Sequence, residues 1–141
     1  MPNYATTTLL EERVTSARLT NLCRGLAGAD RTAMLTNAIE RAEALVDGYL
    51  ATRYSVPVAA NALAEEWTLA IAEYEIYKRG TPNDVPQKIR DSYTDVLALL
   101  KDVAAGRLDI PVSTAALGST GSSMAVSSDA SRYDEDSMEN Y

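Results

Sequence analysis

Between residues 31 and 53, apolar side chains recur every three or four positions, and this spacing permits only one type of regular structure. It places the apolar side chains on one face of an α-helix. The other, solvent-exposed face carries Arg31, Asn37, Glu40, Arg41, Glu43 and Asp47. Asp30 is a suitable N-cap for this helix. Gly48 lies inside this helix, where glycine lowers helix stability by about 1 kcal/mol relative to Ala. A glycine in this position is typical of close approach by another backbone. The apolar positions are Leu35, Ala38, Ile39, Ala42, Leu45, Val46, Tyr49 and Leu50.

A second helix is predicted over residues 61–79, with Asn61 as its cap. It carries two apolar stripes, which predicts burial on more than one side. The first stripe contains Leu63, Trp67, Ala70, Ile71, Tyr74 and Tyr77, and the second contains Ala62, Leu69, Ala72 and Ile76. Such a helix could lie centrally in the monomer or against a neighbouring subunit. We expect the second stripe to be a face that the bundle leaves uncovered and that a neighbouring subunit covers.

The remaining segments complete an all-α prediction. Residues 1–26 are typical of two short helical pieces, the first capped by Thr8, and a further helix runs from Pro86 to about Ala105, ending at Gly106. Residues 1–112 are therefore expected to form a bundle of about four to five helices. Residues 113–141, rich in Ser, Gly and Ala and then acidic, form an extended arm that could add a short β segment.

The composition excludes several function classes. The 141 residues include no histidine and one cysteine, Cys23, so histidine-dependent catalysis and a thiolate metal cluster are both excluded. The net charge of −7 argues against a free-standing DNA binder. No stretch is apolar enough to span a membrane, and we expect a cytosolic product without cofactor or metal.

Other patterns have simpler interpretations than a catalytic site. The run from Gly118 to Ser123 lacks the lysine of a phosphate-binding loop and is interpreted as a linker. The acids Asp134, Asp136 and Glu139 lack the spacing of a calcium loop and are interpreted as an acidic tail. The pairs Glu65–Glu66 and Glu73/Glu75 are expected to be surface acids, and Cys23 a core residue.

Two pairs of residues near helix C-termini, Arg53–Tyr54 and Lys78–Arg79, leave two interpretations open. The cations could cap helix ends, or they could contact an acidic partner surface such as the arm of a neighbouring copy. The chain has eight tyrosines and no phenylalanine. Because a tyrosine hydroxyl needs a hydrogen-bond partner, tyrosine is better suited to partly hydrated interfaces between subunits than to a monomer core, and this composition favours an assembly.

With these segments placed, the chain resembles the small neck proteins of Mu-like phages and prophages. The most specific part is the run Asp47-Gly48-Tyr49-Leu50-x-x-Arg53-Tyr54-x-x-Pro57. Further matching positions are Tyr4, Ala5, Thr6, Leu10 and Arg13 at the start, Ala72 to Tyr77 with Arg79, Pro86, Ile89 and Tyr93, Val103 to Leu108, and Ser131 to Tyr141. That family is similar in turn to the head–tail connector proteins of long-tailed phages.

The resemblance implies a non-enzymatic virion protein that forms a ring of about twelve copies under the portal and joins the capsid to the tail. Its implied partners are other copies, the portal protein and a tail-completion or tail-terminator protein, with DNA only as cargo and no membrane. The expected interface residues are Gly48, Tyr49, Arg53, Tyr54, Leu69, Ile76, Arg79, Tyr133, Met138 and Tyr141. The alternative is a small cytosolic helical regulator or nucleic-acid-binding module, which requires a basic recognition helix.

Overall fold

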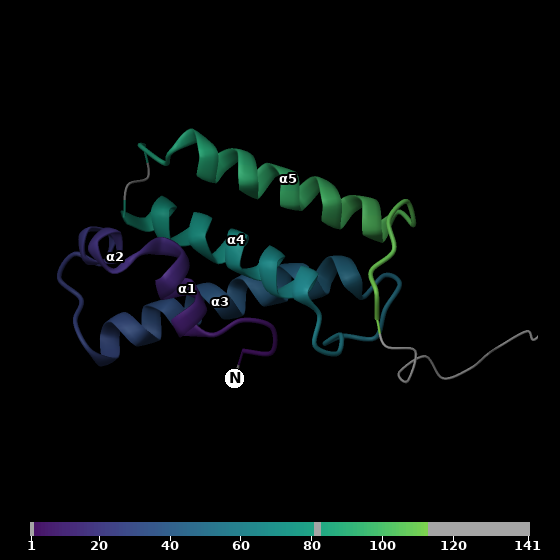
Figure 1. Cartoon of the computed structure of the whole chain (residues 1–141), viewed down its shortest axis with the longest axis horizontal. Coiled ribbons are helices and arrows are strands. Elements are labelled where there is room, and N and C mark those ends of the chain that lie inside the picture. Colours follow the sequence, from purple (N-terminus) through teal and green to yellow (C-terminus); the bar gives the residue numbers. More distant parts are fainter. Residues whose placement is uncertain (1, 81–82, 113–141) are drawn as a thin grey trace, which may run out of the picture.

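Five helices run through residues 2–80 and 83–112, which are the residues that the computed structural model describes (Figure 1). They are α1 (Thr7–Val14), α2 (Ser16–Leu22), α3 (Ala29–Leu50), α4 (Ala62–Gly80) and α5 (Gln87–Ala104). The described residues contain no strand, so the all-α prediction is confirmed. The division into residues 1–112 and 113–141 remains a prediction, because the arm lies outside the described residues.

The N-terminal helices are two pieces, as predicted, but their cap differs from the expectation. Thr6, not Thr8, caps α1, and its hydroxyl accepts a hydrogen bond from Leu9 N (3.3 Å). Thr8 lies inside the helix, because the extended backbone needed for a cap occurs at Thr6. Thr15 has a φ of 70°, which separates α1 from α2.

The long helix α3 starts slightly earlier than predicted. Its N-cap is Gly28, and Asp30 lies in the first turn instead of capping the helix. A carboxylate in the first turn still interacts favourably with the positive end of the helix dipole.

Helix α4 is central, and it contacts each of the other four helices. Its predicted cap is confirmed, since Asn61 Oδ1 accepts hydrogen bonds from the backbone N–H groups of Leu63 (2.9 Å) and Ala64 (3.3 Å). Its second stripe is not an uncovered face. Leu69, Ala72 and Ile76 are buried within the chain, at 6%, 0% and 2% exposure, because neighbouring helices surround α4. Of the four residues of the stripe, only Ala62, at the start of the helix, is exposed.

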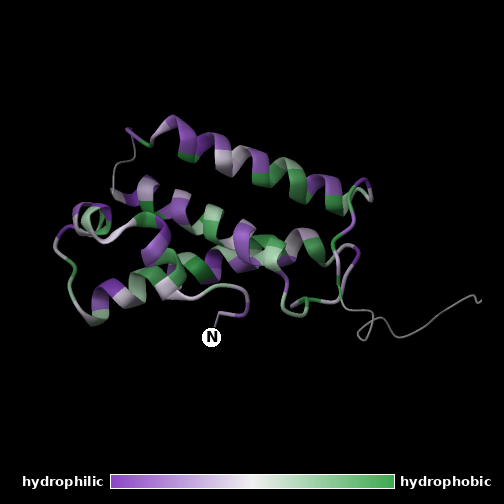
Figure 2. Ribbon diagram, in the orientation of Figure 1, coloured by the Kyte–Doolittle hydropathy of each residue, from purple (hydrophilic) through white to green (hydrophobic). Residues whose placement is uncertain are grey.

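Helix α5 lies alongside α4 with its apolar side toward the rest of the bundle (Figure 2). Tyr74 of α4 and Tyr93 of α5 stack with ring centroids 4.1 Å apart. Gly106 ends the helix with a φ of 79°. Its N–H donates to Val103 O (3.0 Å) while Arg107 N donates to Asp102 O (2.8 Å), which is a Schellman motif.

Close backbone approach occurs at Gly80 and not at Gly48. A Cβ atom at Gly80 would lie 2.7 Å from Leu22 Cδ2 and 3.0 Å from Leu22 Cα, so only glycine fits where α4 crosses α2. A Cβ atom at Gly48 would meet nothing within 4 Å among the described residues. Within the chain, the predicted close approach at Gly48 is therefore wrong.

Candidate interaction surface

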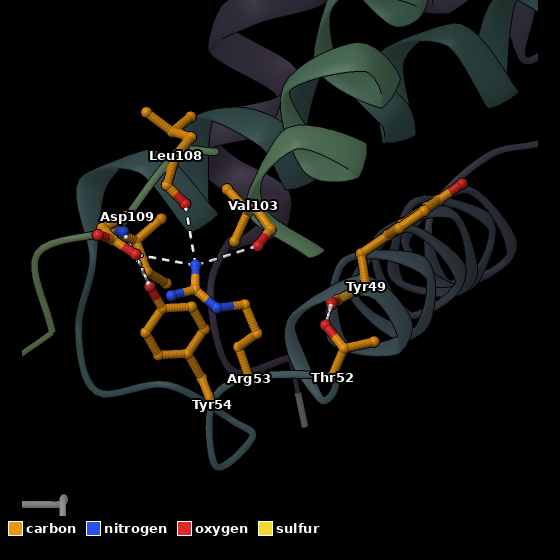
Figure 3. Close-up of polar contacts among 8 residues, drawn as sticks. Tyr49, Thr52, Arg53, Tyr54, Val103, Leu108 and Asp109 are labelled. Carbon is orange, nitrogen blue, oxygen red and sulfur yellow. Dashed lines mark hydrogen bonds and ion pairs between the residues drawn. The ribbon is translucent and has the colours of Figure 1, made fainter. Parts of the chain in front are cut away.

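The end of α3 forms an elbow in which Arg53 contacts a segment about 50 residues away in sequence (Figure 3). Arg53 Nη1 donates hydrogen bonds to the carbonyl oxygens of Val103 (3.2 Å) and Leu108 (3.3 Å), and lies 2.8 Å from Asp109 Oδ1. Val103 belongs to the last turn of α5, whose final carbonyls have no partner in the helix. Arg53 therefore caps α5 and pairs with a carboxylate, both within its own chain.

Tyr54 extends the same elbow. Its hydroxyl accepts a hydrogen bond from Ile110 N (3.2 Å) and donates one to Asp109 Oδ1 (3.4 Å). On the next segment, Asn61 Nδ2 donates to Pro111 O (2.8 Å). Together these bonds fix residues 108–111 against the α3–α4 connection. The chain consequently leaves the described bundle at a defined place, beside the start of α4.

A second polar site attaches the N-terminal segment to α3. The Glu43 carboxylate, only 5% exposed, accepts hydrogen bonds from the backbone N–H groups of Asn3 (2.7 and 2.9 Å), Tyr4 (2.6 Å) and Ala5 (3.4 Å). A buried carboxylate needs such donors to offset its lost hydration. The periodicity of α3 predicted that Glu43 lies on the solvent-exposed face of the helix. This prediction is wrong, because the pattern within one helix does not reveal that the N-terminal segment covers Glu43.

Tyr4 completes this attachment. Its hydroxyl donates to Asp47 Oδ1 and accepts from Val58 N (2.9 Å). Burial raises the pKa of Tyr4 well above its usual value, and the hydrogen bond to Asp47 raises it further. Tyr4 was part of the family resemblance, but nothing in the sequence indicated its partners. The hydrogen bonds of Tyr4 join it to Asp47 and Val58, residues that only the fold brings together.

A third polar cluster corrects the interpretation of the paired acids. Arg13 Nε lies 2.7 Å from Glu73 Oε2, and Arg13 Nη1 lies 2.6 Å from Glu66 Oε1. Glu73 is buried at 8% exposure and is not the surface acid that was expected. It is buried because α1 packs against α4 and supplies the neutralising guanidinium.

A groove of about 630 Å³ opens between the first half of α3 and the last turns of α4. Arg79 and Lys78, which are both exposed, line it together with Arg41. None of these three side chains forms an ion pair with another residue in the described ranges. The pair Lys78–Arg79 thus differs from Arg53, whose charge is already neutralised by Asp109.

The structure does not bring the predicted interface residues together on one surface of its described part. Arg53 and Tyr54 lie together at the elbow, while the side chain of Tyr49 points away from them and is half-buried (Figure 3). Gly48 is exposed on α3, and Arg79 lines the groove. Leu69 and Ile76 are core residues, which removes them from any surface of this conformation. Tyr133, Met138 and Tyr141 lie outside the described residues.

Residues 2–80 and 83–112 contain no group of three or more His, Cys, Asp or Glu side chains that could hold a metal ion. Cys23 is buried at 3% exposure, and burial raises the pKa of its thiol, so it is the core residue that was predicted. No helix in these ranges combines the length and hydropathy required to cross a bilayer.

Comparison with known proteins identifies the family. No curated protein matches the chain. The family described as "Bacteriophage Mu, Gp36" matches residues 4–128, which includes every helix and the elbow. This match confirms the resemblance to Mu-like phage proteins that the Asp47–Pro57 run carried. The chain therefore belongs to the bacteriophage Mu Gp36 family.

Proposed function

We propose that this protein is a head–tail connector of a Mu-like phage, a structural component without catalytic activity. Copies of it form a ring under the portal of the filled capsid, and the ring presents the surface that the tail joins. Its partners are other copies, the portal protein and a tail-completion or tail-terminator protein. DNA passes through the ring as cargo. The protein is present in the virion neck and, during assembly, in the host cytoplasm.

The observation that carries this proposal is membership of a bacteriophage family over residues 4–128. The structure adds support from the elbow. Arg53, Tyr54 and Asn61 hold residues 108–111 in one place, so every copy presents its C-terminal arm from the same position. A closed ring requires such a fixed origin, because every copy must have the same conformation and present the same surfaces to its neighbours.

The charge of the protein also suits a ring around DNA. The chain carries a net charge of −7, and the bundle, residues 1–112, carries 15 acids and 12 bases. A channel lined by an excess of acids repels the phosphate backbone and keeps the duplex from adhering during ejection. A DNA-binding regulator requires the opposite sign on at least one helix.

Complementation of particles tests the proposal. DNA-filled heads are purified from a phage that lacks this gene, and the full-length protein is added before purified tails. We expect electron microscopy to show ring-shaped density under the portal and infectious particles to appear only when the protein is present. Heads that accept tails equally well without the protein, or a protein absent from purified virions, would overturn the proposal. A salt-sensitive shift of free DNA would favour the regulator instead.

A further inference from the structure

The groove between α3 and α4 has an apolar floor and a basic rim. The partly buried Leu26 and Met34 contribute apolar surface to it, and Ile76, at 2% exposure, lies beneath this floor. A smaller adjoining pocket of about 170 Å³ shares Leu26 and Arg79 with the groove. The two hollows form one surface near the C-terminal end of α4.

The charge of this surface is opposite to that of the chain as a whole. Arg41, Lys78 and Arg79 line the groove and Arg24 lines the smaller pocket, whereas the only acids among the lining residues are Asp30 and Glu75. The lining therefore has a net charge of +2, while residues 1–112 together carry −3. A ligand that fits it combines carboxylates with large apolar side chains.

We propose that this groove binds the acidic C-terminal segment of the same chain, residues 132–141. The segment contains the four acids Asp134, Glu135, Asp136 and Glu139 and one arginine, for a net charge of −3. Tyr133, Met138 and Tyr141 stand among the acids. The two tyrosines and the methionine supply the apolar contacts with the floor, and the carboxylates pair with the cations of the rim.

The length of chain between bundle and segment favours binding within one molecule. Pro111 is held beside Asn61 at the start of α4, and Arg79 is 18 residues further along that helix, a separation of about 27 Å at 1.5 Å per residue. Nineteen residues, from 113 to 131, connect the bundle to the segment. The average end-to-end distance of a flexible chain of this length is about 24 Å. A linker whose average length matches the span gives the highest effective concentration of the tethered segment. In dilute solution, the chain's own segment therefore outcompetes that of a second copy.

Zero-length cross-linking of carboxylates to lysines by a carbodiimide tests this inference on the full chain. The sequence contains only three lysines, Lys78 at the groove, Lys88 and Lys101 on α5. Lys101 lies in the last turn of α5, near the point where the chain leaves the bundle. We expect peptide mapping to join Asp134, Asp136 or Glu139 mainly to Lys78. Cross-links mainly to Lys101, or none to Lys78, would overturn the inference.

Mixing of isotope-labelled and unlabelled protein distinguishes cross-links within one chain from cross-links between two chains. In an equal mixture of ¹⁴N and ¹⁵N protein, cross-linked peptide pairs are expected to carry a single label. Pairs with mixed labels would assign the groove to a neighbouring copy's segment and overturn binding within the chain. This result does not depend on the connector function, because it is measured without heads or tails.

A pair of charge reversals provides the variant test. The double variant Arg41→Glu/Arg79→Glu keeps Lys78 as the reporter, and both replaced side chains are exposed, so folding is expected to be retained. Loss of two ion pairs is expected to reduce the Lys78 cross-link by about fivefold. The matched control Arg90→Glu changes an exposed cation of α5 that does not line the groove. An equal effect of the control, or none of the double variant, would overturn the inference.

Discussion

At the residue scale, the elbow depends on one guanidinium. Arg53 supplies two hydrogen bonds and one ion pair to residues 103–109. Arg53→Met keeps most of the aliphatic side chain and removes the polar contacts. Because the Arg53 side chain is one-third exposed, we expect a loss of about 1 kcal/mol in the free energy of unfolding, measured with urea. The control Arg107→Met breaks an exposed ion pair with Asp102 and is expected to cost less than about 0.5 kcal/mol. Equal losses would contradict a special role for Arg53.

The attachment of the N-terminus gives a pH-dependent prediction. Burial and the bond to Asp47 raise the pKa of Tyr4 in the folded protein, whereas in the unfolded chain this hydroxyl ionises near pH 10, at about the ordinary value for tyrosine. The unfolded chain therefore binds fewer protons than the folded one above this pH. The free energy of unfolding consequently falls as the pH rises.

Tyr4→Phe isolates this contribution. At pH 7 the variant is expected to lose about 1–2 kcal/mol, because Val58 N loses its acceptor and Asp47 its donor. Between about pH 9 and 11 its stability is expected to fall less steeply than that of the wild type. The remaining slope comes from Tyr93 and Cys23, whose pKa values burial also raises. Parallel curves for the two proteins would show that Tyr4 does not carry this dependence.

At the element scale, the central position of α4 determines what its surface tolerates. Leu69 is buried at 6% exposure, whereas Leu63, on the same helix, is 40% exposed. Leu69→Glu is expected to destabilise the monomer by about 4 kcal/mol or more, since it buries an unpaired charge. Leu63→Glu is expected to change stability by less than about 0.5 kcal/mol. A folded, stable Leu69→Glu monomer would mean that α4 does expose its second stripe.

The two helical glycines give a matched pair. Gly80→Ala places a Cβ atom against the backbone of Leu22 and is expected to cost about 1–3 kcal/mol. Gly48→Ala meets open space within α3 and is expected to stabilise the isolated protein by about 0.5–1 kcal/mol through helix propensity. Thermal unfolding of both variants measures these changes. Destabilisation by Gly48→Ala would reveal a contact at this position.

At the scale of the whole molecule, the bundle and the arm are expected to have separate roles. The described residues form a buried core, and Leu35, Ile39, Ile71 and Leu100 are among its fully buried members. Deletion of residues 128–141 is therefore expected to lower the free energy of unfolding by no more than about 1–2 kcal/mol, the range of a weakly docked segment. The same deletion is expected to abolish completion of infectious particles, measured by complementation. Full infectivity would show that the arm is dispensable, and a larger loss of stability would make it part of the core.

The helices were predictable because their causes are local. Spacing of three and four indicated the helices α3 and α4, Asn61 was recognisable as a cap, and Gly106 as a helix end. These features depend on residues within a few positions of one another. The absence of histidine is likewise a property of the sequence alone, and it excludes histidine-dependent catalysis within one chain whatever the fold.

Tertiary structure decided which surfaces remained free. The second stripe of α4, the wet-face position of Glu43 and the surface position of Glu73 were all assigned from one helix at a time. Each is buried by a segment distant in sequence, whether by neighbouring helices, the N-terminal segment or α1. Arg53 likewise caps α5 rather than its own helix. Periodicity indicates that a helix has an apolar side. Which residues are buried on its other sides depends on the segments that pack against them, because burial is a property of pairs of segments.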